Sequence, residues 1–124
     1  MEVTIFHKNL TEGEGRFFDD YVAEKMAVIE ALLTKYAHDA VILKINVEKF
    51  EKHNAFDVEF VLNLPGKSLV AKEASHTPNK AVDLAKDRLV AQIKKHLAHL
   101  RNDRQHESVR QPEVVMRMPL ANKG

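Results

Sequence analysis

The sequence predicts an α+β fold in two layers, with the element order β-α-β-β-β-α, one four-stranded mixed sheet and two helices on one face of that sheet. Two segments, residues 11–36 and 78–101, repeat apolar side chains at steps of three and four, which is typical of amphipathic helices. Runs rich in β-branched and aromatic residues precede the first segment and fill the interval between the two. A chain of 124 residues has the size of one domain.

The first strand and the first helix are predicted from the amino-terminal third of the chain. The run VTIFH, residues 3–7, suits a pleated sheet. Thr11 is followed three residues later by Glu14, and this spacing is typical of a capping box at a helix start. The expected apolar stripe of the helix consists of Phe18, Val22, Met26, Ile29, Leu33 and Tyr36, widened by Phe17, Tyr21 and Leu32, and its other side is acidic, with Asp19, Asp20, Glu24 and Glu30.

Three strands are predicted between the helices. From Phe56 to Leu62, apolar residues alternate with mostly polar ones, as expected of a strand with one buried and one wet face. Pro65 and Gly66 suit the two central positions of a tight turn, and residues 51–54, EKHN, should close the preceding hairpin. The strand after the first helix should lie parallel to the first strand, because a β-α-β unit crosses over to a parallel neighbour. The three predicted strands are residues 40–50, 55–63 and 67–75.

The second helix is predicted to begin at Thr77-Pro78, because Thr can cap a helix and Pro loses no intrahelical hydrogen bond at the first position. We expect it to end near Arg101 or Asn102. The predicted organisation is therefore a domain over residues 1–101 and a flexible basic tail over residues 102–124, which contain two prolines and no sustained period. The apolar stripe of this helix consists of Val82, Ala85, Leu89, Ile93, Leu97 and Leu100.

Charge is distributed unevenly, although the formal net charge is only +1. Residues 1–78 hold 9 Lys and Arg against 13 Asp and Glu, whereas residues 79–124 hold 10 against 5. This polarity suggests an anionic partner for the carboxyl-terminal third, although Lys and Arg on a solvated helix face are the commoner explanation of such a pattern. The chain has no cysteine, and no apolar run is long enough for a membrane span. We therefore expect a cytoplasmic protein that has no disulfides and no membrane contact.

Catalytic signatures are absent, so we predict no enzyme, no catalytic residue and no cofactor. Pro65-Gly66-Lys67-Ser68 resembles the end of a phosphate-binding loop, but Val61 stands where that loop requires its first glycine. His96 and His99 are one helical turn apart and His106 follows in the predicted tail, but no fourth ligand stands at a recognisable spacing. We accordingly predict no metal site.

The cations of the second helix are the strongest functional signal. At 100° per residue, Arg88, Lys95 and His99 fall on one flank of the apolar stripe. The helix dipole also favours cations near a helix carboxyl end, and this purely structural reason accounts for part of the pattern. The other flank carries Lys80, Lys94 and Arg101.

Three segments together resemble the ribosome hibernation-promoting factor family, also called ribosome-associated inhibitor A or sigma-54 modulation proteins. They are the first strand leading to Asn9-Leu10-Thr11, the hairpin VEFVLNLPGKSLVAKEAS at 58–75, and AVDLAKDRLVAQIKKHL at 81–97. The resemblance covers about residues 1–100 and points to the short form of the family. It implies a non-enzymatic inhibitor of translation that docks on the small (30S) ribosomal subunit and its 16S ribosomal RNA.

Within this resemblance, the positions that would meet ribosomal RNA are Lys86, Arg88, Lys94 and Lys95 on the second helix and Lys25 on the first. The binding would be backbone recognition, with cations against phosphates. We expect a monomer when the protein is not bound to ribosomes. Two alternatives stay open: a general RNA-binding module, and a protein-interaction domain that uses the open sheet face or the cluster Val114-Val115-Met116.

Overall fold

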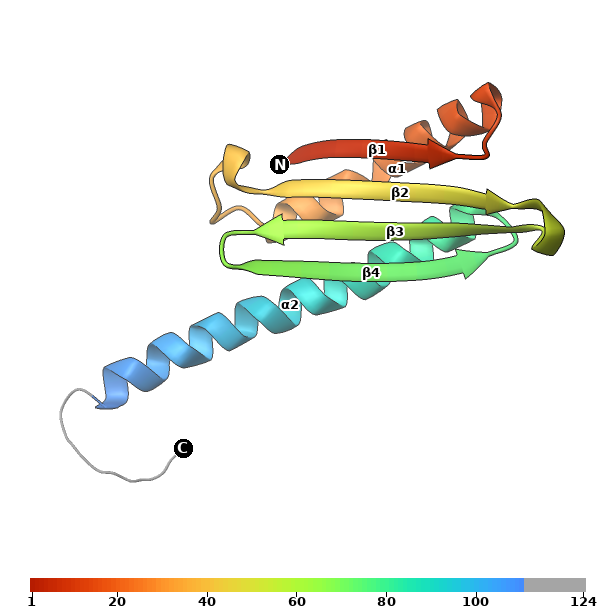
Figure 1. Cartoon of the computed structure of the whole chain (residues 1–124). Helices are drawn as coiled ribbons and strands as arrows, with labels where there is room; N and C mark the ends of the chain where they lie inside the picture. The colour runs from red at the N-terminus through yellow and green to blue at the C-terminus, as the bar shows by residue number, and fades with distance from the viewer. Residues whose placement is uncertain (111–124) are drawn as a thin grey trace. The chain divides into compact units, whose positions relative to one another are not determined.

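The structure, a computed structural model, describes the backbone of residues 1–110 and the side chains of residues 1–102. The observed order of helices and strands is the predicted one, β-α-β-β-β-α (Figure 1). Two short 3₁₀ turns, His38–Ala40 and Glu51–His53, join neighbouring elements. The main elements are β1 (Glu2–Lys8), α1 (Glu12–Leu32), β2 (Ile42–Phe50), β3 (Ala55–Leu64), β4 (Lys67–Ser75) and α2 (Pro78–Arg110).

The strands form one mixed sheet in the order β1-β2-β3-β4. β1 lies parallel to β2, and the two later pairs are antiparallel, as predicted. Gly66 closes the β3–β4 hairpin with a φ of 77°, a conformation that glycine adopts without strain. Asn54 ends the preceding 3₁₀ turn with a φ of 47°, which Asn tolerates better than most residues. Both predicted hairpins are therefore confirmed.

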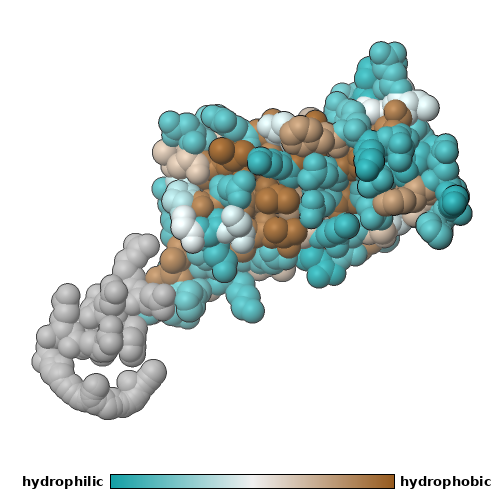
Figure 2. Space-filling model, in the orientation of Figure 1, coloured by the Kyte–Doolittle hydropathy of each residue, from teal (hydrophilic) through white to brown (hydrophobic). Residues whose placement is uncertain are grey.

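The core lies between one face of the sheet and the two helices, in the unit Met1–Ile93 (Figure 1). The predicted alternation in β3 is confirmed, since every second side chain from Phe56 to Leu64 is buried. The opposite sheet face is open, and apolar side chains gather at its centre within a hydrophilic border (Figure 2). The core includes Phe18, Val22 and Ile29 of α1, Leu43, Ile45 and Val47 of β2, Phe60 of β3, and Val82, Leu89 and Ile93 of α2.

The first helix differs from the prediction at its carboxyl end and at Phe17. It ends at Leu32, where the Leu33 N–H donates to the Glu30 carbonyl oxygen at 3.0 Å and closes the last turn. Tyr36 therefore lies in the following turn rather than in the helix. Phe17 is 52% exposed, because it stands one residue, or about 100°, from the buried Phe18. Its assignment to the core stripe was wrong.

The second helix is longer than predicted and continues to Arg110. Residues 102–110 contain no glycine or proline, and Pro112 is the first residue after Arg101 that opposes helix formation. The helix thus continues where the apolar period has stopped, because no residue in this segment breaks it. The chain divides into two units, Met1–Ile93 and Lys94–Gly124, and each is described by itself. The predicted flexible tail lies outside the described residues from position 111 onward.

The start of α1 combines the predicted capping box with a salt bridge to β2. The Glu14 N–H donates to Thr11 Oγ1 at 3.1 Å, and the Thr11 N–H donates to Glu14 Oε1 at 2.9 Å. Lys49 Nζ donates to Glu14 Oε2 at 2.9 Å. The Thr11 N–H, and then Lys49, lower the pKa of Glu14 from its ordinary 4.5.

A lowered pKa makes this carboxylate a pH-dependent source of stability. Its contribution is complete above the ordinary pKa of 4.5 and is lost as the pH falls through the lower folded value. We expect Glu14→Gln to flatten the acid limb of the unfolding free energy, measured by urea denaturation from pH 7 to pH 3. Glu12→Gln removes a carboxylate that is 89% exposed in the same helical turn and is the control. Acid limbs of equal slope in wild type and Glu14→Gln would contradict the expectation.

Candidate nucleic-acid interface on the second helix

The second helix begins as predicted. The Lys80 N–H donates to Thr77 Oγ1 at 3.3 Å, and Pro78 occupies the first helical position. The apolar stripe that contains Val82 and Leu89 is buried, so the opposite side of the helix faces solvent. Lys80 is exposed there and has no ion-pair partner within the part of the chain whose side chains are described.

Two predicted phosphate-binding cations are already paired with carboxylates. Lys86 Nζ lies 3.1 Å from Asp87 Oδ1, and the Lys86 side chain is only 19% exposed. Arg88 reaches across to β4, where its Nε donates to Glu73 Oε2 at 2.6 Å and its Nη2 contacts the same oxygen. Arg88 remains 57% exposed. An incoming phosphate would therefore compete with Glu73 for this guanidinium.

Lys25, the one candidate on α1, is part of a contact between the two helices. Its Nζ lies 4.0 Å from Asp83 Oδ1 of α2 and 4.7 Å from the centre of the Tyr21 ring. The Tyr21 hydroxyl donates to both carboxylate oxygens of Asp83, at 2.8 and 2.9 Å. This hydrogen bond, with burial, raises the pKa of Tyr21 above its ordinary 10.0. Lys25 therefore has a structural partner in addition to its predicted role.

The Tyr21 hydroxyl should contribute measurably to the packing of α1 against α2. Tyr21→Phe removes its hydrogen bonds to an ionised carboxylate, so we expect the free energy of unfolding to fall by about 1–2 kcal/mol. Tyr36→Phe is the matched control, because the Tyr36 hydroxyl makes no hydrogen bond to another described residue. Chemical denaturation of both variants provides the measurement. Equal losses would show that the contact between Tyr21 and Asp83 is not the cause.

The remaining candidates lie in the unit Lys94–Gly124, described by itself. Lys94, Lys95, His99 and Arg101 are all exposed on the helix. His99 already interacts with another group of the protein, so it is not counted among the unpaired cations. No ion pair of Lys94, Lys95 or Arg101 occurs among residues 1–102. Lys80, Lys94, Lys95 and Arg101 are therefore the candidate cations that have no ion pair within residues 1–102.

The carboxylate partners of the cations were not among the residues predicted from the sequence. Leu69, Ala71 and Glu73 share the helix-facing side of β4, since Ala71 pairs with the buried Phe60. A carboxylate that points toward the core side of a strand requires a partner. The position of Glu73 in the alternating pattern of β4 was therefore the sequence signal for its contact with Arg88. No comparable signal existed for the pair Tyr21 and Asp83, because 62 residues separate them.

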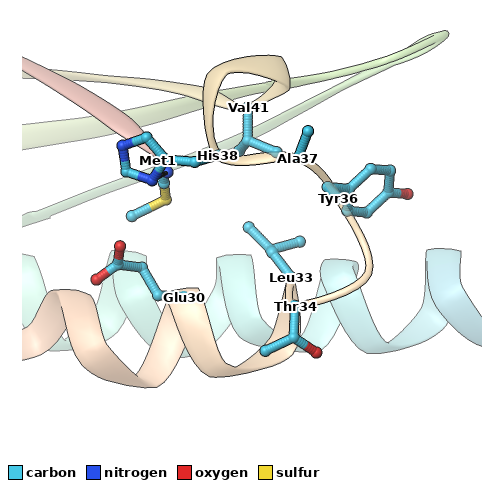
Figure 3. A pocket seen from close by; sticks show the side chains of 8 residues that line it. All are labelled: Met1, Glu30, Leu33, Thr34, Tyr36, Ala37, His38 and Val41. Carbon is cyan, nitrogen blue, oxygen red and sulfur yellow. Dashed lines mark hydrogen bonds between the residues drawn. The ribbon is translucent and has the colours of Figure 1, made fainter.

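The hollows of the unit Met1–Ile93 include the following pair. One is a pocket of about 170 Å³ between the end of α1 and the turn before β2, where the Met1 amino group lies 2.6 Å from His38 Nδ1 and the Glu30 carboxylate lies nearby (Figure 3). The other, of about 500 Å³, lies on the open sheet face beside Phe6 and Phe50. Within residues 1–102, no three His, Asp or Glu side chains are grouped as a metal site would require. Among the described residues, no helix is both long and apolar enough to span a bilayer.

Comparison with known proteins identifies relatives over most of the chain. The family model described as sigma 54 modulation protein / S30EA ribosomal protein matches residues 15–101. Two proteins from Pseudomonas putida, each named ribosome hibernation promoting factor, are 38% identical over 77 residues, which cover 62% of this chain and 70% of each relative. The segment matched by the family model contains all the candidate cations and His99.

The solved structures with a similar fold include a protein domain from Thermus thermophilus and a protein from Coxiella burnetii. The Protein Y N-terminal domain from Thermus thermophilus has a TM-score of 0.58 and 26% identity, and the match covers 77% of this chain and 99% of that domain. A ribosomal subunit interface protein from Coxiella burnetii has a TM-score of 0.55 and 18% identity, with coverage of 79% and 99%. The second match supports the fold alone.

Proposed function

Because this chain belongs to the sigma 54 modulation protein / S30EA ribosomal protein family, we propose that it is a ribosome hibernation factor, which binds ribosomes and inhibits translation. The observation that carries this proposal is the 38% identity over 77 residues to the two proteins named ribosome hibernation promoting factor. The absence of a catalytic pattern in the sequence is consistent with a binding protein rather than an enzyme. Ribosome binding would place it in the cytoplasm.

We further propose that the second helix meets the 16S ribosomal RNA of the 30S subunit. The first contacts would come from the cations that have no ion pair within residues 1–102, which are Lys80, Lys94, Lys95 and Arg101. Such a cation breaks no internal ion pair when it binds a phosphate group. Arg88 would join by exchanging Glu73 for a phosphate group. Lys25, Lys86 and His99 complete the proposed contact set.

Sedimentation of extracts from resting and growing cells tests the proposed function. The protein should travel with 30S or 70S particles in resting cells, and added salt should release it, because phosphate contacts weaken as ionic strength rises. A protein that stays in the ribosome-free fractions under both conditions would refute ribosome binding. Equal affinity for isolated duplex RNA and for ribosomes would instead favour a general RNA-binding module.

Glu73 should limit the affinity of the proposed interface. Glu73→Gln frees Arg88 from a partly exposed ion pair worth about 0.5–1 kcal/mol, so we expect ribosome binding to strengthen by about two- to fivefold. Glu48→Gln, which removes the partner of Lys8 on the open sheet face, makes the same change in net charge and is the control. Titration of labelled protein against purified ribosomes gives the affinities. Unchanged or weaker binding by Glu73→Gln would mean that Glu73 positions Arg88 rather than competes for it.

A further inference from the structure

The first helix exposes a preorganised aromatic ring. The rings of Phe17 and Tyr21 are stacked, with centroids 6.4 Å apart and an interplanar angle of 16°. Two hydrogen bonds to Asp83 hold the Tyr21 ring in place, while Phe17 is 52% exposed. Binding on the outer face of Phe17 would therefore cost little side-chain entropy.

The surface beside Phe17 is negatively charged without internal compensation. Asp20 and Glu24 follow Phe17 at helical steps of three and seven, which brings both carboxylates to the side of the helix that holds the ring. Both are exposed and have no ion pair with any residue whose side chain is described. Neighbouring carboxylates do have partners, since Glu12 pairs with Arg16 and Asp19 Oδ1 lies 2.7 Å from His7 Nε2.

Gly13 leaves the approach to Phe17 open. A helical side chain leans toward the preceding turn, and Gly13 stands four residues before Phe17 without a side chain of its own. A Cβ atom built on Gly13 would meet nothing within 4 Å. The space above the first turn of α1 is therefore accessible from solvent.

We propose that Phe17, Asp20 and Glu24 form an arginine-binding surface, which docks a cationic segment of another protein. A guanidinium group can stack on an aromatic ring and donate paired hydrogen bonds to a carboxylate, so it matches both features of this surface. The same carboxylates repel phosphate, which makes RNA a poor occupant. The surface lies on α1, whereas the cations assigned to RNA lie on α2 with the exception of Lys25, so the inference goes beyond the proposed function and does not require it.

The test measures binding of a fluorescent peptide of six Arg-Gly repeats to the full chain by anisotropy. We expect Phe17→Ala, and separately the double variant Asp20→Asn with Glu24→Gln, to weaken binding by at least about fivefold. A peptide of six Lys-Gly repeats carries the same charge but cannot stack as a planar group, so wild type should bind it more weakly. Circular dichroism shows whether each variant keeps its fold.

A matched control is present on the same helix. Val28 is 48% exposed and Glu30 is exposed, so Val28→Ala with Glu30→Gln removes exposed apolar surface and one carboxylate charge about three turns from Phe17. An equal loss in this control, or no loss in the two test variants, would overturn the proposal. So would tighter binding of single-stranded oligo-uridine RNA than of the peptide at this surface. Ribosome sedimentation of the same proteins separates the two proposals, because its failure in wild type would leave peptide binding intact.

Discussion

Ribosome binding should fall by at least about 100-fold when Arg88→Gln, Lys94→Glu and Lys95→Glu are combined, and inhibition of protein synthesis should fall with it. One cation is removed and two are reversed on the helix that we propose to face phosphates. The salt dependence should also become shallower, by about 0.7–0.9 log units per lost phosphate contact for each log unit of salt. Cosedimentation with purified ribosomes over a salt series, with in vitro translation in parallel, provides both measurements.

The choice of residues in this variant follows from the ion pairs. Glu at position 88 would face Glu73 across the contact that Arg88 now makes, and two neighbouring carboxylates would destabilise the fold for reasons unrelated to RNA. Gln avoids this repulsion. Lys94 and Lys95 have no ion-pair partner in the described structure, so their reversal should change stability by only about 0.5 kcal/mol each.

A control of equal charge tests whether position matters. Arg16→Gln with Lys67→Glu and Lys72→Glu changes the same number and kinds of charges on α1 and β4, and both lysines are exposed. If binding depends on net charge alone, this control should lose as much affinity as the α2 variant. Loss in the α2 variant alone would support the second helix as the interface. A folded α2 variant that binds ribosomes like wild type would remove that helix from the mechanism.

The fold was predictable because its signals are local. The Thr11 capping box, the Thr77-Pro78 start and the Pro65-Gly66 turn each act within a few residues, and the two apolar periods distinguish helix from strand. Errors occurred where local signals compete or end. α2 continues after its apolar period stops because no residue breaks the helix before Pro112, and Phe17 lies beside the buried stripe rather than in it.

The candidate site was predictable only in part. Charge and spacing selected the cations, but the partners of Lys25 and Arg88 come from other elements of the fold, 58 and 15 residues away in sequence. Such contacts depend on how helices and strands pack, which no local pattern specifies. The structure therefore changes the hypothesis from a uniformly cationic helix to one in which some cations are paired and others are uncompensated.

The apolar stripe of α2 should stabilise the protein unequally on the two sides of Ile93. Leu89 is fully buried, so Leu89→Ala should lower the free energy of unfolding by about 2–5 kcal/mol through lost burial and a residual cavity. Leu97 belongs to the second unit and is only half-buried, so Leu97→Ala, the same chemical change, should cost less than about 1 kcal/mol. Urea denaturation of both variants gives the two values.

Leu89→Ala also tests the proposed function, because Leu89 is next to Arg88 in sequence. Stability of natural domains is about 5–15 kcal/mol, so Leu89→Ala can remove a large share of it and yet leave a folded protein at low temperature. Under those conditions its ribosome affinity should equal that of wild type, since none of the proposed phosphate contacts is changed. Equal destabilisation by both substitutions would show that Leu97 contributes as much to stability as Leu89 does. A folded Leu89→Ala protein with weakened binding would show instead that the position of α2 on the sheet, and not its charge alone, determines recognition.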